Sequence, residues 1–169
     1  MTVAPAATET GSRSRRPGVL DGLGLLLRLV LAGVLGYAGW TKVVDLTGSV
    51  QNVLAYQLFG YEVSRAVGIL LPVVELALAA LLLLGLLTRA AAATTAVLML
   101  VFVAGIVSAW ARGLSIDCGC FGTGGQVAPE ETRYLGEILR DAGFLAMALW
   151  LSVRPRSLLS VDHHLQRRT

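Results

Sequence analysis

The residues with the clearest chemical potential are two cysteines that stand one residue apart. They are the only cysteines of the chain and occur in the segment Asp117-Cys118-Gly119-Cys120-Phe121-Gly122. A pair this close closes almost no loop, so it cannot stabilise the fold by restricting the unfolded chain. Its chemistry must be local: a small, strained disulfide, or two soft ligands for one metal ion.

Disulfide exchange is the use that this spacing favours. Exchange requires a thiolate nucleophile and a second sulfur near enough to resolve the mixed disulfide. Gly119 allows the backbone distortion that so small a ring demands, and a strained disulfide is relatively oxidising. We therefore predict Cys118 and Cys120 as the catalytic residues.

Two alternatives to exchange remain open. Two thiolates could hold Cu(I) in a linear site, but zinc would need two more ligands, and no further histidine or cysteine is expected on that side of the protein. We therefore predict no metal site. Two half-buried cysteines without function are the second alternative.

A very apolar chain must position this pair. The sequence has 169 residues, of which 55% are hydrophobic and 15% charged, and its mean hydropathy is +0.70. This composition places it among membrane proteins, with membrane lipid as its surroundings. The net charge of +3 comes from arginines gathered at the two ends, so no nucleic-acid partner is expected.

The apolar segments predict an all-α membrane protein, a bundle of four transmembrane helices. Each segment can cross a hydrocarbon layer of about 30 Å at about 1.5 Å per residue. The spans are expected at about 19–44, 66–87, 90–110 and 134–153. The segment 45–64 is expected to form a short amphipathic helix at the interface. Residues 18–154 form the membrane domain, between a disordered tail over 1–17 and a basic cytoplasmic tail over 155–169.

The basic residues near the span ends predict the orientation. Eight arginines flank one side of the spans, whereas four basic residues, Lys42 among them, flank the other. By the positive-inside rule, both termini of this multi-pass plasma-membrane protein lie in the cytoplasm. The cysteine segment is then extracytoplasmic, where disulfides persist.

Charged residues within or near the spans are costly unless they are paired or hydrated, so they are candidate supporting groups. Arg28 and Glu75 both fall near the membrane midplane, and we expect an ion pair between them. Such a pair serves packing specificity more often than proton relay. Lys42 is expected to anchor the end of the first span at the interface.

Three charged residues of the fourth span are predicted to share one helix face below the cysteines. Glu137, Arg140 and Asp141 stand at positions i, i+3 and i+4, so they can pair within the helix. Arg140 could stabilise a thiolate or a bound quinone oxygen. A salt bridge that only neutralises charge is the equally open alternative.

With these residues assembled, the chain resembles the MauE/DoxX family of four-helix membrane proteins, and its MauE branch in particular. The likeness covers about residues 24–153 and rests on Arg28, Gly39-Trp40-Thr41-Lys42, Ala55-Tyr56-Gln57-Leu58-Phe59, Leu71-Pro72-Val73-Val74-Glu75, the cysteine segment and Leu139-Arg140-Asp141. The resemblance implies maturation of the disulfide-rich small subunit of methylamine dehydrogenase, or extracytoplasmic thiol redox in relatives outside methylamine use. The architecture also resembles vitamin K epoxide reductase, which leaves quinone open as a cofactor.

The combined expectation is a thiol-disulfide oxidoreductase at the extracytoplasmic face of the plasma membrane. Cys118 and Cys120 would exchange disulfides with a thioredoxin-like protein or a secreted client, supported by Arg140, Glu75, Arg28, Lys42, Glu137 and Asp141. A non-enzymatic assembly or chaperone factor is the competing class. A small transporter built on Arg28 and Glu75, or a Cu(I)-binding protein, is the weaker alternative.

Overall fold

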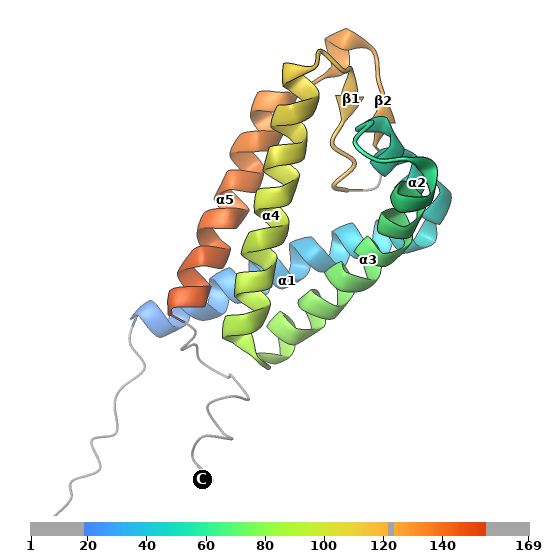
Figure 1. Ribbon diagram of the computed structural model, residues 1–169. Coiled ribbons are helices and arrows are strands. Elements are labelled where there is room, and N and C mark those ends of the chain that lie inside the picture. Colours follow the sequence, from blue (N-terminus) through green and yellow to red (C-terminus); the bar gives the residue numbers. More distant parts are fainter. Residues whose placement is uncertain (1–18, 122–123, 155–169) are drawn as a thin grey trace, which may run out of the picture.

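Five helices dominate the part of the chain that the computed structural model describes, residues 19–121 and 124–154 (Figure 1). They are α1 (Val19–Val44), α2 (Leu46–Ala55), α3 (Tyr61–Leu84), α4 (Thr88–Ala111) and α5 (Tyr134–Val153). Between α4 and α5 lie the antiparallel strands β1 (Ile116–Asp117) and β2 (Gly125–Gln126) and the 3-10 turn η1 (Pro129–Glu131). The predicted tails, 1–17 and 155–169, lie outside the described residues.

Three of the helices, α1, α3 and α4, are long and apolar enough to cross a membrane. The 24 residues of α3 extend about 36 Å, more than the hydrocarbon layer requires. Large apolar side chains such as Leu70, Val73 and Val101 stay exposed on the outer faces, as lipid surroundings allow. The prediction of a mostly helical protein with helices long and apolar enough to cross a membrane is confirmed, whereas the fourth span stays a prediction because α5 carries three charged residues in its first half.

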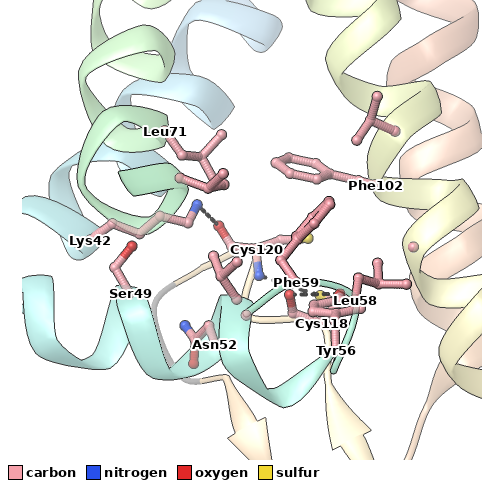
Figure 2. Close-up of a pocket in the computed structure, with 15 residues that line it drawn as sticks. Lys42, Ser49, Asn52, Tyr56, Leu58, Phe59, Leu71, Phe102, Cys118 and Cys120 are labelled. Carbon is pink, nitrogen blue, oxygen red and sulfur yellow. Dashed lines mark hydrogen bonds between the residues drawn. The ribbon is translucent and has the colours of Figure 1, made fainter. Parts of the chain in front are cut away.

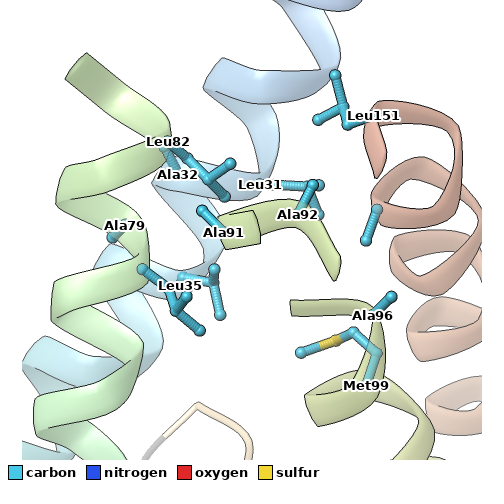
Figure 3. Packing of buried hydrophobic residues seen from close by; sticks show 12 residues of the cluster. Leu31, Ala32, Leu35, Ala79, Leu82, Ala91, Ala92, Ala96, Met99 and Leu151 are labelled. Carbon is cyan, nitrogen blue, oxygen red and sulfur yellow. The ribbon is translucent and has the colours of Figure 1, made fainter. Parts of the chain in front are cut away.

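The long helices pack as two antiparallel pairs that converge at one end of the protein (Figure 1). α1 lies along α3, and α4 lies along α5. Near the converging end, leucine and alanine side chains from all four helices form the main core, including Leu31, Leu35, Leu82, Ala92, Ala96 and Leu151 (Figure 3). Alanine lets the helix backbones approach closely, and such close packing is one of the forces that hold helices together in lipid.

At the other end the two pairs diverge, and α2, β1 and β2 lie between them (Figure 1). A second cluster there includes Ile106 and Ala109 of α4, Ile116 of β1 and Tyr134 of α5. The Tyr134 hydroxyl accepts a hydrogen bond from the Ile116 amide at 3.1 Å and donates one to the Leu114 carbonyl. These contacts fix the start of the cysteine segment against α4 and α5.

The predicted boundaries between the first two spans need correction. α3 begins at Tyr61 rather than near residue 66, because Gly60 caps it and the amphipathic segment is helical only over α2. The buried face of α2 carries Ser49, Asn52 and Ala55, so its inward face is polar and small rather than apolar. The short hairpin of β1 and β2 was not predicted, since two-residue strands leave no periodic signal.

α2 is held against α3 by a close backbone approach at Gly68. The Ser49 hydroxyl donates a hydrogen bond to the Gly68 carbonyl at 2.7 Å. A Cβ atom on Gly68 would lie only 2.7 Å from Cα of Val50. The site end of the fold therefore depends on glycine at this position.

We predict that Gly68→Ala destabilises the protein although alanine favours helices. The new methyl group must push the α2 backbone away, and overpacking of this kind costs about 1–3 kcal/mol. Gly33→Ala is the matched control, because a Cβ there would meet nothing within 4 Å and alanine gains up to about 1 kcal/mol in a helix. Thermal unfolding in detergent measures both variants. Equal melting temperatures for the two variants would contradict the tight α2 contact.

Candidate functional site

The two cysteine side chains meet in the buried loop that follows β1. Both are free thiols, and each is 8% exposed. The Cys120 amide donates a hydrogen bond to Sγ of Cys118 at 3.4 Å. Gly119 between them has a φ of 66°, a left-handed conformation that glycine adopts without strain. The structure thus brings the predicted pair together in a reduced form.

Two adjacent residues of α5 give the thiols opposite partners. The Arg140 guanidinium donates through Nη2 to Sγ of Cys118 at 3.3 Å, whereas the Cys120 thiol donates to Oδ2 of Asp141 at 3.7 Å. Arg140 and Asp141 also form an ion pair at 2.9 Å. The guanidinium lies 4.7 Å from the centre of the Phe121 ring, a cation–π contact. Arg140 is therefore held in place from three sides.

These contacts polarise the two thiols in opposite directions. The pKa of Cys118 lies below its usual value because the neighbouring Cys120 side chain and amide stabilise its thiolate, with a further contribution from Arg140. The pKa of Cys120 is raised, since its thiol lies beside the Cys118 sulfur and is buried near the charge of Asp141. Of the two thiols, Cys118 is thus the one that ionises more readily.

Glu137 completes the α5 side of the site. Its Oε1 accepts a hydrogen bond from the Cys118 amide at 3.5 Å. The predicted face of Glu137, Arg140 and Asp141 does point to the cysteines, but the ion pair within it joins the neighbours Arg140 and Asp141.

A buried ion pair holds the loop from the opposite side. The Lys42 ammonium of α1 contacts both carboxylate oxygens of Glu75 on α3, at 2.8 and 3.0 Å, and donates to the Cys120 carbonyl at 2.8 Å. Lys42 is 3% exposed and Glu75 is fully buried. The prediction of Lys42 as an interfacial anchor is therefore wrong, since its charge is used inside the protein.

The predicted ion pair between Arg28 and Glu75 is also wrong, because Glu75 pairs with Lys42. Arg28 lies on α1 fourteen residues before Lys42, which corresponds to about 21 Å along the helix axis. The antiparallel register explains this separation, since a Cβ on Gly36 would contact Ala79. Arg28 is buried but lies towards the converging end, away from the cysteines.

Two residues at the end of α2 belong to the site although they were not predicted there. The Tyr56 hydroxyl donates to the Cys118 carbonyl at 3.0 Å, and burial together with the nearby thiols raises the pKa of Tyr56. The Asn52 side chain packs against Gly119 and Gly124. The signal in the sequence was their spacing, because a polar residue followed four positions later by an aromatic residue places both on one face of a helix.

A cavity of about 120 Å³ adjoins the thiols (Figure 2). Both cysteines and Gly119 line it on the loop side. The other walls are mostly apolar and come from α2, the turn after it, α3 and α4, with Lys42, Asn52, Phe59, Leu71 and Phe102 among the lining residues. The space therefore lies between the two diverging helix pairs, with the cysteine loop as one of its walls.

Among the described residues, a metal could be held only near Cys118. Ligand atoms of Asp117, Cys118 and Glu137 lie within 4.8 Å of one another. These carboxylates were not among the ligands predicted from the sequence, which were limited to histidine and cysteine. The positively charged Arg140 guanidinium already contacts the Cys118 sulfur. Its charge would repel a divalent cation at the same atom.

The fold and the site define a helical membrane protein with a buried, polarised dithiol. A family model described as methylamine utilisation protein MauE matches residues 20–154. The chain therefore belongs to the MauE family, a family tied to methylamine utilisation, and the match includes every residue of the site. No curated protein and no solved structure matches the chain. Membership of the wider DoxX-like group of membrane proteins stays a prediction.

We predict that Arg140→Leu shifts the pH dependence of Cys118 alkylation to higher pH. Loss of the guanidinium raises the pKa of Cys118, so the thiolate fraction at neutral pH falls on the order of tenfold for each pKa unit. Rates of iodoacetamide labelling, resolved for each cysteine by mass spectrometry, measure the effect. Arg140→Lys, which keeps the charge, should retain most of the labelling rate. A pH profile unchanged in Arg140→Leu would show that Arg140 does not activate the thiol.

Proposed function

We propose that this protein exchanges disulfides with a partner protein through Cys118 and Cys120. The observation that carries the proposal is the opposite environment of the two sulfurs, with Arg140 on one and Asp141 on the other. Exchange needs one thiol that ionises and one that resolves, and these contacts supply that difference. A pair kept only for packing requires neither a guanidinium nor a carboxylate at its sulfur atoms.

In the oxidising direction, a client thiolate attacks Sγ of Cys118 in the Cys118–Cys120 disulfide. The S–S bond of the pair breaks, and Cys120 leaves with the electron pair and takes up a proton, for which Asp141 is the nearest relay. A second client thiolate then attacks the mixed disulfide, and Cys118 leaves as a thiolate that Arg140 stabilises. The client loses two electrons and the protein pair gains two.

We further propose that α5 is a fourth span and that the cysteine loop is extracytoplasmic. The start of α1, the turn between α3 and α4, and the end of α5 lie at the same end of the protein (Figure 1), which supports the grouping of the basic residues. Because Lys42 is buried and paired, the charge count becomes eight against three, a stronger bias than the sequence count.

The exposed side chains around the turn after α2 are the proposed docking surface for the partner. Leu58, Phe59 and Tyr61 are 47%, 53% and 60% exposed at the same end as the cysteines. Membership of the MauE family supports a secreted client of methylamine utilisation, and the disulfide-rich small subunit of methylamine dehydrogenase is the first to test. A thioredoxin-like carrier is the second.

We predict that Cys120→Ser traps a mixed disulfide between Cys118 and the client, because the resolving thiol is gone. Cys118→Ser should trap far less, since Cys120 is the thiol that ionises less readily. Non-reducing gels of cells alkylated before lysis, followed by mass spectrometry of the adduct, measure both variants at matched expression.

Two results would contradict disulfide exchange. One is equal adduct formation, or none, in both variants; the other is a wild-type pair that stays reduced in intact cells while client maturation proceeds. Either result would favour the assembly or chaperone class.

A further inference from the structure

Two helices that can cross a membrane form part of the wall of the cavity beside the cysteines. Its lining includes Val67 of α3 and Val101 of α4, which are 36% and 59% exposed on two helices that can cross the membrane. Val101 stands ten residues before the end of α4, or about 15 Å along the helix axis. A molecule that enters between these valines therefore comes from the hydrocarbon layer.

The cavity suits a neutral ligand. Apart from the cysteines, Lys42 is the one lining residue with an ionisable acid or base of usual charge at neutral pH among those that the structure describes, and Glu75 compensates its charge. The remaining walls are mainly aliphatic and aromatic. A charged ligand would lose its hydration there without gaining a partner, which is strongly unfavourable.

One polar group at the cavity wall lacks a partner. Asn52 is 5% exposed, and neither Nδ2 nor Oδ1 makes a hydrogen bond. A buried amide in this state costs free energy. A ligand oxygen that accepts a hydrogen bond as a carbonyl when oxidised, and donates one as a hydroxyl when reduced, would give the Asn52 amide a partner in both redox states of the ligand.

We propose that this cavity binds the ring of a lipid-soluble quinone, which reoxidises the Cys118–Cys120 dithiol. The inference rests on the proposed exchange function, because it names the electron acceptor of the same pair. Its basis is the meeting of an apolar cavity beside two helices that can cross a membrane, an unpartnered amide, and both cysteines on one wall.

The step balances without a further reactant. Cys118 and Cys120 lose two electrons and two protons and form one S–S bond. The quinone takes up both electrons and both protons and leaves as the hydroquinone. The cavity of about 120 Å³ is smaller than the roughly 300–1,000 Å³ of pockets that enclose whole drug-sized molecules. It therefore holds the ring, while the apolar tail lies between α3 and α4 in the lipid.

The test uses the full chain in lipid nanodiscs, reduced and then freed of reductant. The probe is a decyl-substituted benzoquinone with all ring positions substituted, so that thiols cannot add to the ring. We expect one hydroquinone, measured by absorbance, for each Cys118–Cys120 disulfide, measured by mass spectrometry. Asn52→Leu should raise the half-saturating quinone concentration about three- to tenfold, the equivalent of one lost hydrogen bond.

Val101→Trp, which fills the cavity mouth, should abolish hydroquinone formation. Val97→Trp is the matched control, because Val97 is 61% exposed on the same face of α4 and does not line the cavity. Equal rates in Val101→Trp and Val97→Trp would overturn the proposed quinone site.

A second oxidant separates this inference from the exchange function. If oxidised glutathione forms the Cys118–Cys120 disulfide in the wild-type protein and the quinone does not, the quinone proposal is wrong and exchange stands. If neither oxidant forms the disulfide, both proposals are wrong.

Discussion

The buried contact of Lys42 with Glu75 and the Cys120 carbonyl is the constraint on which the rest of the site depends. It joins α1, α3 and the cysteine loop at one ammonium group. Removal of one partner from a buried ion pair typically costs about 3–5 kcal/mol, because the other charge is left uncompensated. Such a pair is a poor way to gain stability but a good way to fix geometry. Here it fixes the loop backbone, so that the two sulfurs face α5.

The loop is consequently held between two helix pairs that contact each other closely only at the far end. Lys42 and Glu75 hold it from α1 and α3, while Glu137, Arg140 and Asp141 hold it from α5. Because the partners on α5 are adjacent in sequence, one helix turn gives one sulfur a cation and the other an anion. The divergence of the two helix pairs also leaves the cavity beside the cysteine loop. The same divergence therefore provides both the place for the thiols and the proposed access from the membrane.

The sequence was sufficient for the helices but not for their register. Long apolar runs mark α1, α4 and α5 at or near their observed ends, since a membrane span needs a continuous run of such residues. The partner of Glu75 depends instead on which glycine of α1 faces which residue of α3, and a periodic pattern does not encode that. The position of Lys42 was predicted wrongly for a similar reason. A lysine near a helix end usually extends its charge to the interface, and only the folded loop supplies the Cys120 carbonyl as a partner. The role of Asn52 was hidden because a polar residue on an amphipathic helix normally faces water.

Disulfide exchange at this site requires that Cys118 and Cys120 act as one two-electron couple. Equilibration of the full chain in nanodiscs across a series of glutathione redox buffers, followed by alkylation and intact-mass measurement, tests it directly. We expect one transition, in which both thiols become resistant to alkylation together and the protein loses two hydrogens without gaining glutathione. Separate titration of the two cysteines as glutathione adducts, or alkylation of both across the whole series, would contradict it.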